Sequence, residues 1–255
     1  MLNSRRRMTY NNKIDVDAVA FIAKGITNVT HQKAVNYLCV ELKKANLWNK
    51  MVAIYPLVGG TAALHAWNLK NLSKHNITWG SGVTHSAQGI VNNSSLSSLN
   101  LHSNDIANIG TSFHAAFYFH TNSQSTRSSY AIAHPNMAEA GDMNAIFAAI
   151  PYSDGRIYYC HSSGMVVNGR RLKFALCNKL GQSQAVYIDG SSAVSANTTP
   201  RATISQSFVL NRCGLNGSNA SRMSFISLGS GFTDAEQATL YNIVQQYQTI
   251  LGRAV

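Results

Sequence analysis

The clearest pattern of hydrophobic and polar positions lies near the C-terminus, over residues 222–252. Its first seven residues have the two-residue period of a β-strand whose faces are both largely covered. After Gly-Ser-Gly at 229–231, Thr233 and Glu236 stand at the spacing of a capping box, which marks the start of a helix. Apolar residues then recur at every third or fourth position to the end of the segment. The sequence therefore predicts a strand, a tight turn and a closing helix, with Met223, Phe225 and Ser227 on one face of the strand and Ser224, Ile226 and Leu228 on the other.

Helical patterns also fill the first 56 residues. A short helix is expected over residues 16–23 and a longer one from Thr30 to a left-handed stop at Asn46, followed by a turn over 47–53. This unit has too little apolar surface to stand alone. We therefore expect it to pack on the rest of the chain or on a partner.

From residue 77 onward the hydrophobic period shortens to that of strands. Short stretches rich in β-branched and aromatic residues are separated by turn dipeptides such as Asp189-Gly190. About ten short strands without intervening helices favour an antiparallel sandwich. The expected strands are 77–79, 98–102, 112–121, 129–133, 145–149, 156–162, 171–178, 184–188, 206–212 and 222–228.

The charge is uneven along the chain. The 255 residues carry a formal net charge of +11, with 21 Lys and Arg against 10 Asp and Glu. Residues 1–74 hold 11 of the basic and three of the acidic side chains. Such a segment can contact nucleic acid, an acidic protein surface or an anionic glycan, or can simply be a solvated basic face. No nucleic-acid-reading motif is present, so nucleic acid is not an expected partner.

The remaining compositional signals exclude several classes of site. The four cysteines have no zinc-like spacing and are expected to be reduced thiols. There is no HExxH motif and no cluster of acids suited to calcium, so no metal or cofactor is expected. The basic start is not followed by an apolar run, and no segment is long and apolar enough for a bilayer, so neither a secretory signal nor membrane insertion is expected.

Two blocks of sequence resemble a family of bacteriophage and prophage virion-associated proteins. They are NLWNKMVAIYPLVGGTAALHAWNLK at 46–70 and SFISLGSGFTDAEQATLYNIVQQYQTILGR at 224–253. The segment QAVYIDGSSAV at 184–194 also resembles a hairpin of that family, with its turn at Asp189-Gly190. The likeness covers residues 15–255. In that family a short helical segment precedes a concanavalin A-like, laminin-G-like jelly roll closed by a C-terminal helix.

The resemblance implies a mainly β fold, an antiparallel jelly-roll sandwich with an N-terminal helical segment and a closing C-terminal helix. The expected organisation is a basic flexible arm at 1–14, a helical docking segment at 15–56, a connector at 57–75 and the jelly roll at 76–255. If the basic N-terminal third is the docking element, deleting residues 1–74 should leave a folded sandwich.

The function implied by the resemblance is that of a structural component of a phage particle, in a tail, fibre or capsid appendage. The protein would be made in the host bacterial cytoplasm and located in the virion. Its partners would be other virion proteins, further copies of itself and host-surface polysaccharide. The alternative is a free-standing, lectin-like carbohydrate-binding module.

Sandwiches of this architecture often bind sugars, and the strand expected at 112–121 offers suitable side chains. Its alternation places Phe113, Ala115, Phe117 and Phe119 toward the core, and His114, Tyr118 and His120 on the other face. That second face is either a sugar-binding surface or an ordinary sheet surface that is solvent-facing or covered by a helix. The candidate ligand-binding residues are His114, Tyr118, His120, Tyr159 and His161.

Catalysis is not expected from the sequence. Glycosidases of the related laminarinase type carry E-x-D-x-x-E or E-x-D-x-E on one strand, and this run is missing. The glutamates are Glu41, Glu139 and Glu236, which are widely spaced. We therefore expect a non-enzymatic protein without catalytic residues, whose candidate docking residues are Arg5, Arg6, Arg7, Lys43 and Lys44.

Overall fold

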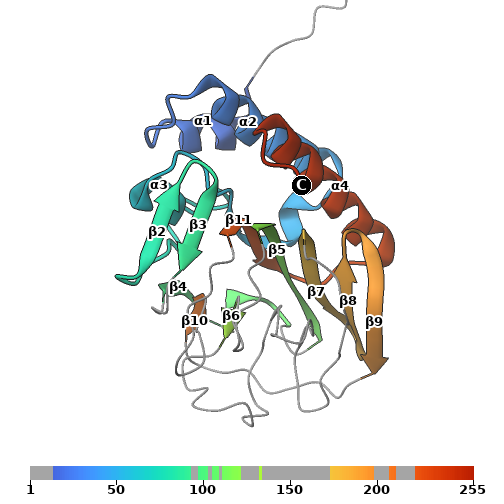
Figure 1. Cartoon of the computed structure of the whole chain (residues 1–255). Helices are drawn as coiled ribbons and strands as arrows, with labels where there is room; N and C mark the ends of the chain where they lie inside the picture. The colour runs from blue at the N-terminus through green and yellow to red at the C-terminus, as the bar shows by residue number, and fades with distance from the viewer. Residues whose placement is uncertain are drawn as a thin grey trace, which may run out of the picture.

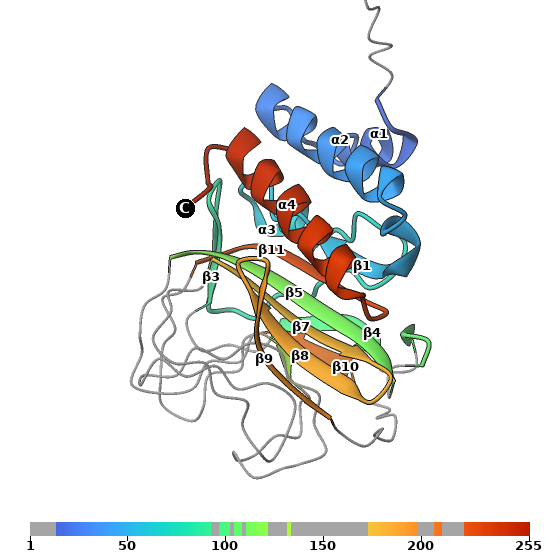
Figure 2. The same ribbon diagram turned by 90° about the vertical axis from the view of Figure 1, so that its right-hand side faces the viewer.

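The computed structural model describes residues 14–92, 97–102, 105–108, 111–121, 132–133, 173–197, 207–210 and 222–255. In these residues the fold is mainly β, with two antiparallel sheets and a layer of helices over one face of the larger sheet (Figures 1 and 2). The predicted fold class, including the closing C-terminal helix, is confirmed.

The larger sheet is an eight-stranded sheet of order β2-β3-β11-β5-β7-β8-β9, with β1 also paired to β11. The smaller sheet has the order β4-β10-β6. The strands are β1 (Met51–Tyr55), β2 (Val83–Ser86), β3 (Gly89–Asn92), β4 (Ser97–His102), β5 (Ser112–Thr121), β6 (Ile132–Ala133), β7 (Phe174–Leu180), β8 (Ser183–Ile188), β9 (Ser191–Asn197), β10 (Ser207–Leu210) and β11 (Arg222–Gly229).

The helices are α1 (Val16–Ile22), α2 (Val29–Lys44), the 3-10 turn η1 (Trp48–Lys50), α3 (Ala62–Ala66) and α4 (Asp234–Ile250). Helix α4 lies across the sheet and separates it from the α1–α2 pair (Figure 2). Two predicted helix signals are confirmed: Asn46 has a positive φ of 58°, and Thr233 and Glu236 form the capping box of α4. At the other end of α4, Gly252 has a positive φ of 66°. The start of the second helix differs by two residues, because Asn28 rather than Thr30 caps α2.

Two hydrophobic cores lie on opposite faces of the larger sheet. The first, between the two sheets, contains Phe113, Phe117 and Phe119 of β5 together with Leu99 of β4. The core positions predicted for β5 are therefore confirmed. The second core lies between the sheet and the helices and includes Tyr118 of β5. Its helical members are Ala18, Phe21, Ala34, Val35, Leu38, Cys39, Leu42, Leu240, Ile243, Val244 and Tyr247.

Two local predictions need correction. The turn expected at 47–53 is present as η1 but ends at Lys50, because the short apolar run Met51–Tyr55 forms β1 and pairs antiparallel with β11. On β11, a register irregularity between Met223 and Phe225 breaks the simple alternation. Met223 consequently packs in the core between the sheets, whereas Phe225 packs under the helices.

The cap of α4 gives a direct test of this fold. Thr233 Oγ1 accepts a hydrogen bond of 3.3 Å from Glu236 N, so Thr233→Ala leaves this N–H without its cap. We expect a loss of about 1 kcal/mol in the free energy of unfolding, measured by urea denaturation. The control is Thr239→Ala on the exposed side of the same helix, where alanine favours helix formation. Equal losses in both variants would contradict the assigned role of the cap.

Candidate functional site

The strand face predicted to bind sugar lies beneath α4. His114 and Tyr118 are both 0% exposed, and α4 and the turn before it cover them. His114 stacks on Phe232 with 4.2 Å between ring centroids. The prediction that these two residues line an open ligand face is therefore wrong in this structure. The alternation correctly grouped them on one face, but the cover supplied by α4 made that face an interior one.

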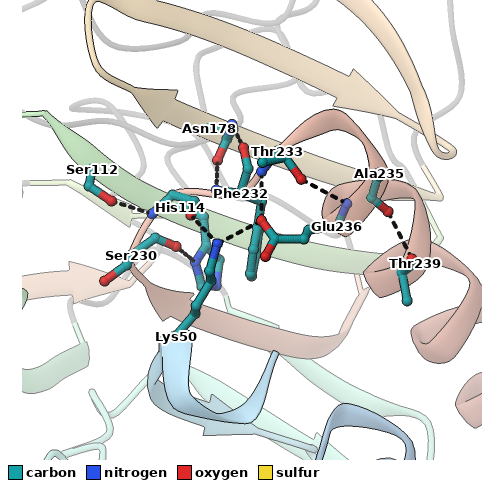
Figure 3. A network of polar contacts seen from close by, with 11 residues as sticks. Lys50, Ser112, His114, Asn178, Ser230, Phe232, Thr233, Ala235, Glu236 and Thr239 are labelled. Atoms are coloured by element: carbon teal, nitrogen blue, oxygen red, sulfur yellow. Dashed lines mark hydrogen bonds and ion pairs between the residues drawn. The ribbon is translucent and has the colours of Figure 1, made fainter. Parts of the chain in front are cut away.

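His114 belongs to a group of polar side chains that we call the turn network, shown in Figure 3. The network fastens the turn at 229–231 and the start of α4 to β5, β7 and η1, and its side chains are Lys50, Ser112, His114, Asn178, Thr233 and Glu236.

His114 bridges strand β11 and the turn that follows it. Its Nδ1 donates to the carbonyl oxygen of Ser230 at 2.7 Å, and Ser227 Oγ lies 3.3 Å from its Nε2. Because a carbonyl oxygen only accepts, Nδ1 carries the hydrogen, and Nε2 accepts from the Ser227 hydroxyl. The pKa of His114 is lowered to about 3, mainly by burial; the hydrogen bond to the Ser230 carbonyl opposes this shift and the charge of Lys50 adds to it. The imidazole is therefore a neutral structural bridge at physiological pH.

Asn178 of β7 holds the next residue of the connection. Its Oδ1 accepts from Phe232 N and its Nδ2 donates to Phe232 O, both at 2.8 Å. Beside it, Ser112 Oγ accepts from Gly231 N at 2.9 Å. These side chains satisfy backbone groups that would otherwise lose their hydrogen bonds to water.

Lys50 and Glu236 form the more exposed edge of the turn network. Lys50 Nζ lies 2.6 Å from Glu236 Oε2, which also accepts from Thr233 N at 2.8 Å. Burial raises the pKa of Glu236, but the hydrogen bonds from Lys50 and Thr233 outweigh it, so the net shift is downward. The Glu236 carboxylate thus has a structural role, because it caps α4 and forms an ion pair with Lys50.

The other predicted ligand and docking residues are dispersed. Tyr118 OH donates to Gln245 Oε1 at 3.1 Å, and His120 Nδ1 lies 3.0 Å from the carbonyl oxygen of Arg253. Lys43 pairs with Asp15 and Asp17 between α1 and α2, and Lys44 pairs with Glu41 on α2. The remaining predicted residues, Tyr159, His161, Arg5, Arg6 and Arg7, lie outside the described residues and stay predictions.

A second polar cluster joins α3 to the β2–β3 hairpin. The buried His65 accepts from Gly60 N at Nε2, at 3.2 Å, and its Nδ1 lies 3.1 Å from His85 Nδ1. Because Nε2 is the acceptor, Nδ1 of the neutral His65 carries the hydrogen and donates to His85. Burial lowers the pKa of His65 to about 3, with contributions from His85, Arg253 and His31, and burial also lowers the pKa of His85. Trp79 packs edge-on against His85 at 4.8 Å between ring centroids.

Sequence reasoning missed this cluster and also missed Arg253, the buried cation next to it. Arg253 is 1% exposed and donates to Gln248 Oε1 and to the carbonyl oxygens of Leu57, Ala87 and Ser224. It therefore ties the C-terminal tail to the hairpin and to β11. A basic residue after the helix end carries no sequence signal for burial, because its acceptors come from distant segments.

The described residues contain no group of three or more His, Cys, Asp or Glu placed to hold a metal ion. Among the helices of the described part of the chain, none is long and apolar enough to cross a membrane.

No protein-family model matches the chain, and no curated protein matches it. Solved structures do. The chain is similar to the Trypanosoma rangeli sialidase in complex with sialic acid, with 10% identity and a TM-score of 0.53, over 82% of this chain and 38% of the sialidase. The chain thus spans well under half the length of that enzyme.

Two further solved structures are similar. Domain 4 of AbnA, a GH43 extracellular arabinanase from Geobacillus stearothermophilus, in complex with arabinotriose, matches with 14% identity and a TM-score of 0.51, over 75% of this chain and 98% of that domain. Botulinum neurotoxin type C, whose cell entry depends upon interaction with two ganglioside molecules, matches with 12% identity and a TM-score of 0.55, over 79% of this chain and 53% of that one. At these identities the matches establish the fold, an antiparallel β-sandwich.

These matches contradict the prediction that the protein is not an enzyme. That prediction rested on the missing laminarinase motif and on the wide spacing of the glutamates, yet sialidases share the fold across most of this chain. The fold itself therefore gives no ground for excluding catalysis.

Stability should fall as the pH drops below about 6.5, because unfolded His65 and His114 bind protons that the folded forms do not. Their folded pKa values lie near 3. The stability that each neutral histidine contributes is fully present above its pKa in the unfolded chain. This stability is lost progressively between about pH 6.5 and pH 3, at about 1.4 kcal/mol per pH unit for each histidine. We expect each of the two histidines to lower the free energy of unfolding by about 2 kcal/mol between pH 6.5 and 5, measured by urea unfolding.

His114→Gln should therefore show a pH dependence smaller than that of the wild type by about 2 kcal/mol over this interval. The matched control is His102→Gln, at an exposed position on β4. If His114→Gln loses as much stability on acidification as the wild type, the neutral buried bridge is not present in solution.

Proposed function

We propose that this chain is a carbohydrate-binding β-sandwich. The observation that carries the proposal is the match to domain 4 of the arabinanase, because 98% of that domain is covered and its structure contains arabinotriose. The similar neurotoxin, whose entry depends on gangliosides, supports the same class of ligand. This is the lectin-like alternative stated from the sequence.

In this proposal, the position of the helices restricts which surface of the sandwich contacts the sugar. The helix-side face of the larger sheet is filled by α4 and the second core, so it offers no room for a ligand. In the proposal, glycan is therefore contacted away from the helices. Tyr159 and His161 lie outside the described residues, and the proposal keeps them as its candidate ligand residues.

The test is titration calorimetry of the full chain with arabino-oligosaccharides and with sialylated ganglioside headgroups. Tyr159→Ala should weaken binding by about tenfold or more, because an aromatic contact of about 1.4 kcal/mol is lost. The control is Tyr37→Ala, a half-buried tyrosine of α2. If no glycan binds, the proposal is wrong; if glycan binds and Tyr159→Ala matches the wild type, the ligand residues are wrong.

We further propose that the module is a component of a phage particle, located in the virion on a tail, fibre or capsid appendage. The support is the sequence resemblance at 46–70 and 224–253, and the structure shows that these two blocks are bonded to each other. Strand β1 pairs with β11, Lys50 O accepts from Ser230 N at 2.9 Å, and Tyr247 OH donates to Pro56 O at 2.6 Å. The resemblance therefore covers one physical unit rather than two unrelated segments.

This bonding changes how docking through the N-terminal region can be tested. Deleting residues 1–74 would remove β1 from the sheet, Lys50 from the turn network and the α1–α2 layer from the second core. We therefore expect such a truncation to destabilise the sandwich, in contrast to the expectation from the sequence. Deletion of residues 1–13 removes the arginine cluster but none of the described contacts, and is the appropriate variant.

Particle association is tested by mass spectrometry of purified phage from the source culture and by immunogold electron microscopy. A particle component is expected in stoichiometric amount at one location, and the variant lacking residues 1–13 should be incorporated less well if the arginines anchor it. Absence of the full chain from particles would rule out the virion setting and leave the glycan-binding proposal standing.

A further inference from the structure

The apolar side chains left exposed in the described part of the chain are concentrated at its N-terminal end. Six large hydrophobic residues are exposed among the described residues, and four of them precede residue 30: Ile14 (45%), Val16 (70%), Val19 (51%) and Val29 (61%). The other two are Leu180 at the end of β7 and Val255 at the C-terminus. Scattered single residues are normal on a protein surface, whereas a cluster indicates a contact.

Helix α1 is apolar on two sides. Ala18 and Phe21 face the second core, while Val16, Val19, Ala20 and Ala23 are exposed. These four positions follow the three- and four-residue spacing of one helix face, and we call them the α1 stripe. The α1–α2 pair lies at the outer end of the molecule, on the far side of α4 from the sheet (Figure 2). The α1 stripe is thus a hydrophobic helix face turned away from the body of the protein.

We infer that the α1 stripe is a self-association surface, on which α1 of a second copy of this chain packs antiparallel. Charge along the helix favours this occupant. Asp15 and Asp17 stand at the start of α1 and the exposed Lys24 stands just after its end. An antiparallel partner places each end beside the opposite charge and opposes the two helix dipoles, which a parallel partner would not do.

Side-chain size agrees with this packing. Ala20 and Ala23 allow two helix axes to approach closely, and Val16 and Val19 can fill the space beside them. Such a two-fold contact uses the same patch on both copies and closes at a dimer. A membrane surface is the less suitable occupant, because interfacial helices bury Trp, Phe or Leu, and none of these lies on the α1 stripe.

The acidic end of the helix remains available for such a contact. Lys43 pairs with both Asp15 and Asp17, but the Asp17 side chain keeps 39% of its surface exposed. At the other end, Lys24 Nζ sits 4.2 Å from the ring centroid of Trp67. The stripe has four side chains, whereas a standard stable interface uses about 20 to 30 residues on each partner, so the dimer is expected to be weak and to appear only at high protein concentration.

The test is sedimentation velocity of the full chain from about 10 to 500 µM, a range suited to weak association. The wild type should shift toward a dimer, and Val16→Asp with Val19→Asp should remain monomeric across the range. The matched control, Leu180→Asp, places the same charge on an exposed apolar site elsewhere and should associate like the wild type. Unfolding curves establish that each variant is folded.

The antiparallel register has its own test. Lys24→Glu should weaken association, and combining it with Asp17→Lys should restore it, because each copy then presents the reversed pair. Wild type that stays monomeric throughout, or a double-aspartate variant that associates normally, overturns the inference. Co-sedimentation of the monomer with phosphatidylglycerol vesicles would assign the stripe to a membrane and overturn it equally. Glycan binding is measured separately, so either result leaves the proposed function intact.

Discussion

The close approach of the turn at 229–231 to two neighbouring backbones is the constraint on which the helical layer depends. A Cβ atom on Gly229 would lie 1.9 Å from the carbonyl oxygen of Lys50, and one on Gly231 would lie 2.0 Å from that of Lys179. Only glycine fits at either position. Because the turn is pinned between η1 and β7, the chain leaves β11 in a fixed direction. Helix α4 begins three residues after Gly231, so its path across the sheet is set by this contact.

That path determines the rest of the N-terminal half. Helix α4 supplies Leu240, Val244 and Tyr247 to the second core, and α2 packs on α4. The N-terminal helices therefore depend on residues more than 190 positions later in the chain. The buried polar side chains also depend on segments distant in sequence. His114, Asn178 and Arg253 form hydrogen bonds with carbonyl, amide or hydroxyl groups, so they are satisfied without buried carboxylates.

Local signals in the sequence were sufficient for much of the fold. The capping box of α4, the stop at Asn46 and the core face of β5 each depend on residues within one element, and the structure has them as predicted. Strand β1 was missed because a five-residue apolar run is read as a strand only when its partner β11 is known. The irregularity at Met223 was missed because a two-residue period assumes an unbroken register.

The predicted sugar-binding face of β5 was also wrong because it depended on a segment distant in the sequence. Alternation places His114 and Tyr118 together on one side of β5, but it does not specify what lies over that side. The cover is decided by α4, which arrives from a different part of the chain. The same pattern of polar and aromatic residues on a strand is therefore expected for a binding face and for a buried face whose polar groups are hydrogen-bonded. Only the burial of His114 distinguished the two.

The arrangement separates two ends of the molecule, with α1 at one and the smaller sheet of β4, β6 and β10 at the other (Figures 1 and 2). Since the helices close one face of the larger sheet, a ligand and a protein partner need not compete for one surface. If two copies meet through α1, the smaller sheet of each copy lies on the side away from the contact. Two weak sugar contacts held in one assembly act together, because the second is made at a high effective concentration. A small hydrophobic stripe at the end opposite a sugar-binding surface would therefore raise avidity without any change at the surface itself.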